Sequence, residues 1–214
     1  MYPITPSTKM SRVAKRGHYD EATIYQILDE GLFCHIAYVH ENQPMMIPTG
    51  YCRMGNKLYI HGSVGSHFMR NLVDGRRVCL TVSLIDGLVL ARSAFSHSVN
   101  YRSVVMFSSG TLVTDEKERW DALEAFTNHV IPGRWEEVRE PNAKEMKATM
   151  VISFEIEEAS AKVRSGGPND DEEDYQVPVW AGVLPLKLQA QTPITDPKML
   201  FDKPVPDYVV NYKK

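Results

Sequence analysis

The 214-residue chain contains 43% hydrophobic and 24% charged residues, a composition typical of a single globular domain with a packed core. Its net charge of −3 provides no general attraction for a nucleic-acid backbone, and no apolar run approaches the length of a membrane span. Residues 1–16 are polar and lack the apolar stretch of a secretory signal. We therefore expect a cytoplasmic protein without a nucleic-acid or membrane partner.

The first third of the chain predicts one helix, three meandering strands and a second, short helix. Ile24, Ile27 and Leu28 have helical spacing, and Asp20 is placed to cap the first turn. Short turns that contain Asn or Gly separate the strands, which predicts antiparallel neighbours. The expected elements are a helix at 20–31, strands at 33–39, 45–53 and 58–61, and a short helix that begins at Ser66.

The rest of the chain is also mainly β. We expect strands at 78–84, 88–91, 101–114 and 149–156, a tight turn at 85–87 (IDG) and a helix at 115–131. Because βαβ alternation is missing, the fold class is mainly β with added helices, an antiparallel barrel. We expect a single domain over 1–214 in which the proline-containing residues 189–214 form an extended C-terminal arm.

The three cysteines, Cys34, Cys52 and Cys79, are widely spaced and form no CxxC pair. An odd number without metal-ligand spacing predicts reduced, mostly buried thiols and no metal site. A hydrolase or transferase that uses one of these thiols with a histidine stays open, because spacing alone neither supports nor excludes it.

The segment 61–67 (HGSVGSH) is the first candidate site, because a glycine-containing turn at a helix start exposes backbone N–H groups that bind anions. Ser63 and Ser66 add hydroxyl donors, and His61 and His67 add imidazole N–H groups. Together these groups suit a phosphate monoester. The alternative is that the glycines only permit a turn, Ser66 only caps the helix and both histidines are solvated.

A second polar segment, 96–103 (SHSVNYRS), directly precedes the apolar residues 104–107. Such a dense polar run at the beginning of a strand is typical of the rim of a binding site. We therefore treat both polar segments as parts of one candidate site.

Six segments carry a family resemblance: 17–20 (GHYD), 44–51 (PMMIPTGY), 58–63 (LYIHGS), 100–105 (NYRSVV), 161–164 (AKVR) and 178–182 (PVWAG). Together they resemble the pyridoxamine 5′-phosphate oxidase-like superfamily, in particular its flavin-nucleotide-binding branch with the 5-nitroimidazole-resistance-type proteins. The likeness spans about residues 12–188, and no segment is diagnostic without the others. It implies an antiparallel split β-barrel that forms a homodimer, with FMN bound at the dimer interface.

The resemblance also implies which residues contact FMN. The second strand edges the isoalloxazine, the third strand flanks the ribityl chain, and the turn after it meets the phosphate. The implied cofactor-binding residues are Ile47, Pro48, Thr49, His61, Gly62, Ser63, Ser66, His67, Asn100, Tyr101, Arg102, Ser103 and Trp180. Trp180 could instead belong to the core, and Lys162 and Arg164, candidates for binding an anionic substrate group, could be solvated charges.

The implied function is an FMN-dependent oxidoreductase that acts on a small molecule, with a nicotinamide nucleotide as the possible electron donor. Vitamin B6 oxidation itself is not expected, because Met45 and Met46 replace the basic residues of the oxidases and 184–186 (LPL) replaces their C-terminal arginine. The alternative is a protein that binds FMN, or haem through His61 or His97, without turnover.

Overall fold

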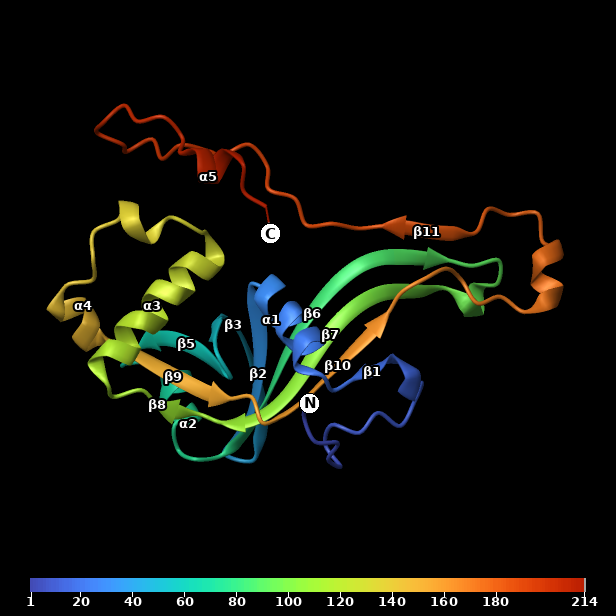
Figure 1. Cartoon of the computed structure of the whole chain (residues 1–214), viewed down its shortest axis with the longest axis horizontal. Coiled ribbons are helices and arrows are strands. Elements are labelled where there is room, and N and C mark those ends of the chain that lie inside the picture. The colour runs from blue at the N-terminus through green and yellow to red at the C-terminus, as the bar shows by residue number, and fades with distance from the viewer. Residues whose placement is uncertain (214) are drawn as a thin grey trace.

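The computed structural model describes residues 1–213, which form two antiparallel sheets with few helices (Figure 1). The seven-stranded sheet has the order β1-β10-β7-β6-β2-β3, with β11 paired to β6, and the four-stranded sheet has the order β4-β5-β9-β8. The predicted fold class, mainly β with added helices in a split barrel, is confirmed. No helix among residues 1–213 combines the length and the apolar character needed to cross a membrane.

The strands are β1 (Gly17–His18), β2 (Phe33–His40), β3 (Gln43–Gly50), β4 (Cys52–Met54), β5 (Lys57–Ser63), β6 (Arg77–Leu90), β7 (Ser98–Ser109), β8 (Thr111–Leu112), β9 (Thr149–Glu155), β10 (Glu158–Arg164) and β11 (Gly182–Pro185). The helices are α1 (Glu21–Glu30), α2 (His67–Leu72), α3 (Glu116–Val130), α4 (Ala143–Ala148) and α5 (Asp207–Val210). Short 3₁₀ turns are η1 (Ala14–Arg16), η2 (Ala94–Ser96), η3 (Trp135–Glu137) and η4 (Glu172–Gln176).

Helix α1 forms where the apolar spacing predicts it. The Asp20 side chain accepts a hydrogen bond from the Thr23 backbone N–H at 2.8 Å and so caps the first turn. Ile24, Ile27 and Leu28 are at most 1% exposed and pack into the main core between the sheets. The helix therefore covers the inner face of the long sheet and fixes the start of β2.

Two expectations about the strands are wrong. Residues 85–87 form no tight turn, because β6 continues from Arg77 to Leu90 with an irregularity between Ile85 and Gly87. The expected strand at 45–53 is two strands, β3 and β4, interrupted at the buried Tyr51. In both places, pairing with strands distant in the sequence determines where the strand continues or ends, and the local turn residues do not.

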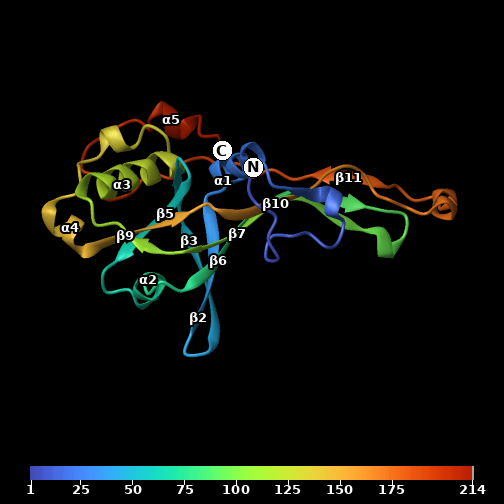
Figure 2. The same ribbon diagram turned by 60° about the horizontal axis from the view of Figure 1, so that its bottom comes forward.

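The outer halves of β6, β7 and β10 extend beyond the barrel as a long ribbon (Figures 1 and 2). β2 pairs with β6 only as far as the row that contains His35, Thr81 and Val105. Asn100 lies five residues beyond Val105 along β7, which is about 16 Å at ~3.3 Å per residue. The ribbon therefore carries Asn100 away from the barrel, whereas Arg102 stays beside Glu30 at the end of α1.

The outer face of the β2–β3 hairpin is apolar and uncovered in the single chain. Phe33 and Val39 alternate onto this face of β2, and Met46 lies opposite Ala37 on β3. Their exposed fractions are 60%, 53% and 59%. An apolar face of this kind on an edge hairpin is typical of a protein–protein interface.

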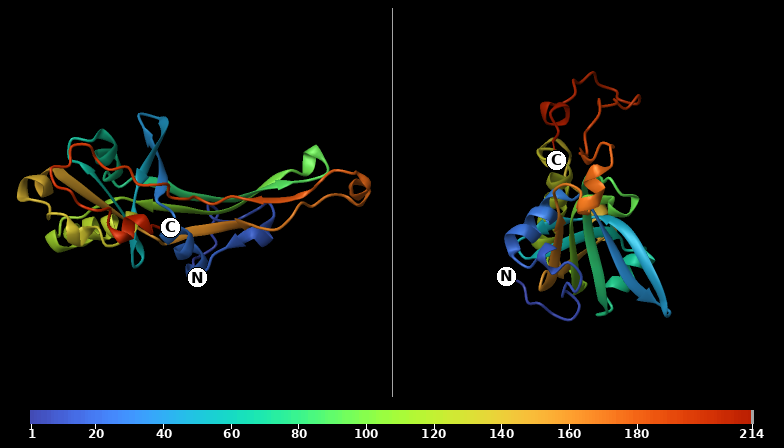
Figure 3. Two further views of the ribbon diagram at one scale, coloured as in Figure 1. Left: turned by 90° about the horizontal axis from the view of Figure 1, so that it is seen from above. Right: turned by 90° about the vertical axis from the view of Figure 1, so that its right-hand side faces the viewer.

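After β11 the chain runs as an arm back across the molecule toward α3 (Figure 3). The Tyr212 hydroxyl donates to the Val130 carbonyl at 2.8 Å, and Arg134 donates to the Tyr208 hydroxyl at 3.1 Å. The arm also exposes Ile194 and Leu200, which are 97% and 91% exposed. It is attached at its end but leaves large apolar side chains in solvent.

Candidate functional site

The first polar segment lies at the junction of β5 and α2. His61 ends the expected strand, but that strand, β5, continues through Gly62 and Ser63, so the expected loop is limited to Val64 and Gly65. Ser66 caps α2, since its Oγ accepts a hydrogen bond from the Met69 backbone N–H at 3.3 Å. The cap leaves the Ser66 hydroxyl hydrogen available to a ligand.

The implied isoalloxazine residues lie on β3, next to β2. Ile47 pairs with Ile36, Pro48 with His35 and Thr49 with Cys34. β3 is one of the two edge strands of the seven-stranded sheet, so among residues 1–213 its backbone pairs with a strand on one side only. Such an edge can donate and accept hydrogen bonds to a planar heteroaromatic ring.

Beside the Ser66 turn, His67 packs against His40, which the sequence pattern did not single out. The two imidazoles meet edge to face with centroids 4.6 Å apart. Asn71 bridges them, with its Oδ1 2.9 Å from His40 Nδ1 and its Nδ2 3.0 Å from His67 Nδ1. His40 ends β2, so only the folded hairpin brings it to this turn.

The His61 ring faces α3 on the other side of β5. Its centroid lies 4.5 Å from that of Phe126, and burial lowers the pKa of His61, which favours the neutral imidazole. A hollow of about 430 Å³ opens at this ring, walled by Leu123, Phe126, Trp135 and Met146, with Arg139 at its edge. We call it the His61 hollow.

The second polar segment lies on the ribbon, where its side chains hold neighbouring strands. Asn100 is buried, donates to the Gly166 carbonyl and accepts a hydrogen bond from Arg164. The Ser103 hydroxyl donates to the Lys162 carbonyl at 3.5 Å, and Tyr101 pairs with Arg164 in the β7–β10 register. These residues join β7 to β10 and to the loop that follows it.

Arg102 is held by two carboxylates. Its guanidinium donates to both oxygens of Glu30, from α1, and to both oxygens of Asp86, from β6. The hydrogen bonds that Arg102 donates to Glu30, and then those to Asp86, raise the pKa of Arg102 above its ordinary value. A flavin phosphate near Arg102 would have to compete with these two carboxylates.

One chain does not bring the two polar segments together. Residues 61–67 lie at the barrel, whereas 100–103 lie along the ribbon, on strands that extend away from it (Figure 1). A site that uses both segments therefore needs two copies of the chain, with the ribbon of one copy reaching the barrel of the other.

A model of the pyridoxamine 5′-phosphate oxidase family matches residues 20–163. The chain belongs to this family. The resemblance inferred from the six sequence segments is thereby confirmed. No curated protein matches the chain.

Solved structures of similar proteins include a flavocytochrome, Anf3, from Azotobacter vinelandii, with 40% identity and a TM-score of 0.91, covering 98% of this chain and 97% of that one. An FAD- and haem-binding protein from Mycobacterium smegmatis has 34% identity and a TM-score of 0.86, covering 91% and 96%. A 5-nitroimidazole antibiotic resistance protein from Bacteroides thetaiotaomicron has 20% identity and a TM-score of 0.59, covering 69% and 86%. At that identity, the third likeness shows the fold alone.

Two features of this oxidase-family chain concern residues near its C-terminus. Trp180 is 69% exposed, so the core alternative for this residue is wrong. Lys162 and Arg164 lie two residues apart on β10, and both line a hollow on the ribbon.

The three thiols of this family member are free, as expected. Burial raises the pKa of Cys34 and of Cys52 to about 12, and Cys79 also shifts upward through burial. A thiol with such a pKa carries almost no thiolate at neutral pH, and thiolate is the nucleophilic form. Burial therefore disfavours the nucleophilic form of these thiols.

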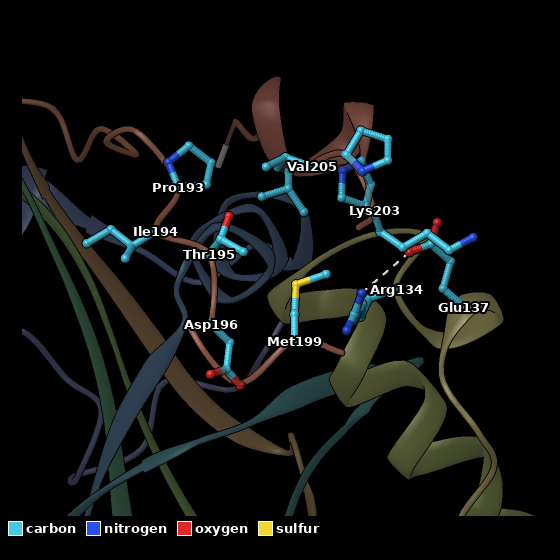
Figure 4. Close-up of a pocket in the computed structure, with 12 residues that line it drawn as sticks. Arg134, Glu137, Pro193, Ile194, Thr195, Asp196, Met199, Lys203 and Val205 are labelled. Atoms are coloured by element: carbon cyan, nitrogen blue, oxygen red, sulfur yellow. Dashed lines mark hydrogen bonds and ion pairs between the residues drawn. The ribbon is translucent and has the colours of Figure 1, made fainter. Parts of the chain in front are cut away.

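A further hollow, of about 790 Å³, lies between the C-terminal arm and the end of α3 (Figure 4). Arg134 and Glu137, which form an ion pair, face Asp196 and Met199 of the arm across it. None of the predicted site residues lines this hollow.

Proposed function

We propose that this chain is a flavin-binding redox protein that works as a homodimer and exchanges electrons with a small molecule. The observation that carries the proposal is that the two polar segments of the candidate site lie apart, one at the barrel and one on the ribbon. The uncovered apolar face of the β2–β3 hairpin offers a surface for the second copy. Membership of the oxidase family and the likeness to a flavocytochrome over 98% of the chain support it. A cytoplasmic location stays a prediction.

In this proposal the flavin lies between the two copies. Ile47, Pro48 and Thr49 would edge its ring, while Gly62, Ser63, Ser66 and His67 would hold its ribityl chain and phosphate. Asn100, Tyr101, Arg102, Ser103 and the exposed Trp180 would come from the partner copy. The bound flavin supplies hydride and one-electron chemistry, and the protein orients it and shields it from water.

The flavin expected from the sequence is FMN, but we propose FAD. The similar protein from Mycobacterium smegmatis, which covers 91% of this chain, is an FAD- and haem-binding protein. Both flavins share the ribityl phosphate, so the Ser66 turn suits either. Chromatography of the flavin released from purified protein distinguishes them.

A protein purified without added cofactor is expected to show flavin absorbance, which bleaches when NADH or NADPH is added without oxygen. A colourless preparation that takes up neither FMN nor FAD contradicts the proposal. Flavin that binds but is reduced by neither nucleotide favours the alternative, a binding or sensing protein without nicotinamide-dependent turnover.

We also propose haem as a second redox group, held in the His61 hollow. His61 presents a neutral imidazole, the form that ligates iron, in a hollow with mostly apolar walls. His97, the other histidine considered from the sequence, lies on the exposed ribbon with its Nδ1 2.9 Å from the Ser93 carbonyl. To meet a haem carboxylate, Arg139 would have to leave Glu145, its ion-pair partner, which also lines the hollow.

The two groups use opposite sides of β5. The His61 ring contacts Phe126 of α3, whereas a side chain at Gly62 would meet Met69 of α2. A haem at His61 and a flavin at the Ser66 turn therefore do not compete for the same space.

Addition of hemin to the purified protein is expected to give a Soret band that His61→Ala loses. His97→Ala, a change of the same kind on the ribbon, should keep it. A Soret band that survives in His61→Ala but disappears in His67→Ala would move the ligand to the His40–His67 pair. No Soret band in the wild type would reject haem while leaving the flavin proposal intact.

A further inference from the structure

The hollow on the ribbon that Lys162 and Arg164 line has strongly cationic walls. It has a volume of about 490 Å³ and is lined by Arg12 and Arg16 near η1, by Lys162 and Arg164 on β10, and by His97 after η2. We call it the cationic pocket. No Asp or Glu side chain is among the residues that line it.

The four lysine and arginine side chains of the cationic pocket have no carboxylate partner among residues 1–213. This contrasts with the rest of the ribbon, where Arg92 pairs with Asp170 and Arg102 with Asp86 and Glu30. In a chain of net charge −3, four unpaired cations in one concave surface create a local positive potential.

Arg164 makes this pocket a built site and not a chance group of surface charges. It is only 6% exposed, and its Nε is buried without a hydrogen-bond partner in the described part of the chain. Its terminal nitrogens are held by Asn100 and by the carbonyls of Gly166 and Gly167. Buried cations normally have an anionic partner, and Arg164 has none among residues 1–213.

We propose that the cationic pocket binds the phosphate groups of a small-molecule ligand. Arginine guanidinium groups match phosphate oxygens in geometry, and several unpaired cations favour a group with more than one negative charge. Phe95, 96% exposed at the rim, offers a face on which a base or ring attached to the phosphates can stack. The ligand class is a nucleotide with a pyrophosphate or a comparable polyphosphate.

Such a pyrophosphate has two possible sources: a second ligand such as a nicotinamide nucleotide, or the flavin itself when it is FAD. The experiment separates them because a flavin phosphate would already fill the pocket in flavin-loaded protein. Binding of inorganic pyrophosphate is measured calorimetrically at physiological salt, with flavin content recorded, so the result does not depend on flavin reduction.

The wild-type protein is compared with the double variant Arg16→Ala/Lys162→Ala, which removes two rim cations without touching the buried Arg164. We expect pyrophosphate affinity to fall by about tenfold or more. The matched control is Lys117→Ala/Lys144→Ala, which removes two exposed cations near the barrel, on α3 and α4. It should bind pyrophosphate as the wild type does.

Weaker pyrophosphate binding in Arg16→Ala/Lys162→Ala alone, with unchanged flavin content, supports a second phosphorylated ligand. The same variant should then also bind NADPH more weakly than the wild type. The flavin is the source of the bound pyrophosphate if flavin-loaded wild type does not bind added pyrophosphate and Arg16→Ala/Lys162→Ala loses FAD. No pyrophosphate binding with equal flavin content in all three proteins overturns the proposal. So does equal weakening in the control, which would show only the effect of net charge.

Discussion

The double variant Phe33→Asp/Met46→Asp is expected to elute as a monomer of 24.3 kDa and to lose its flavin. Both side chains lie on the uncovered face of the β2–β3 hairpin, with exposed fractions of 60% and 59%, so the single chain should still fold. Two carboxylates on each copy would be buried and unpaired in a dimer formed through this face, which costs several kcal/mol. Light scattering gives the mass, and absorbance gives the flavin content.

The control for this variant is Ile4→Asp, which places the same charge on a 61% exposed apolar side chain near the N-terminus. It should keep both the dimer and the flavin. If the double variant stays dimeric, another face forms the interface. If it becomes monomeric but keeps its flavin, each copy binds the cofactor alone and the shared-site proposal is wrong.

The double variant Ser66→Ala/His67→Ala is expected to release flavin. Each hydrogen bond to a charged phosphate contributes about 1.5–3 kcal/mol, so losing two weakens binding by roughly 10²-fold to 10⁴-fold. Equilibrium dialysis with the flavin measures the change directly. Unchanged affinity would mean that the phosphate lies elsewhere.

Ser66 also caps α2, so the loss of the cap has to be separated from the loss of a ligand contact. Ser66→Asp provides this separation, because aspartate caps a helix as well as serine does but repels a phosphate. We expect this variant to lose its flavin and to unfold at the same temperature as flavin-free wild type. A Ser66→Asp variant that retains flavin would show that the hydroxyl only caps the helix.

Much of the secondary structure follows from local patterns. The apolar spacing and the Asp20 cap predict α1, and the spacing of apolar residues from Trp120 to Val130 predicts α3, because a helix is decided by neighbours three and four residues away. The turn expected at 85–87 fails for the opposite reason. Asp86 is held by Arg102 from the next strand, and Gly87 pairs with both Asn100 and Pro185.

Part of the chemistry of the candidate site can be predicted from the sequence. The polar segments around Ser66 and Asn100 stand out in the sequence, and the family pattern relates them to a flavin. The same pattern relates Lys162 and Arg164 to an anionic substrate group. The two polar segments lie apart because β6 and β7 extend past the end of their pairing with β2. No local sequence pattern predicts the length of that extension.

Residues close in the chain thus predict α1, α2 and α3, most strands and the family resemblance, but not α4 or α5. The contacts of His40 with His67, and the placing of Arg12 and Arg16 beside Lys162 and Arg164, arise only in the folded chain. They join segments separated by 27 to about 150 residues, and such contacts are selected by packing of the whole core and not by local propensity.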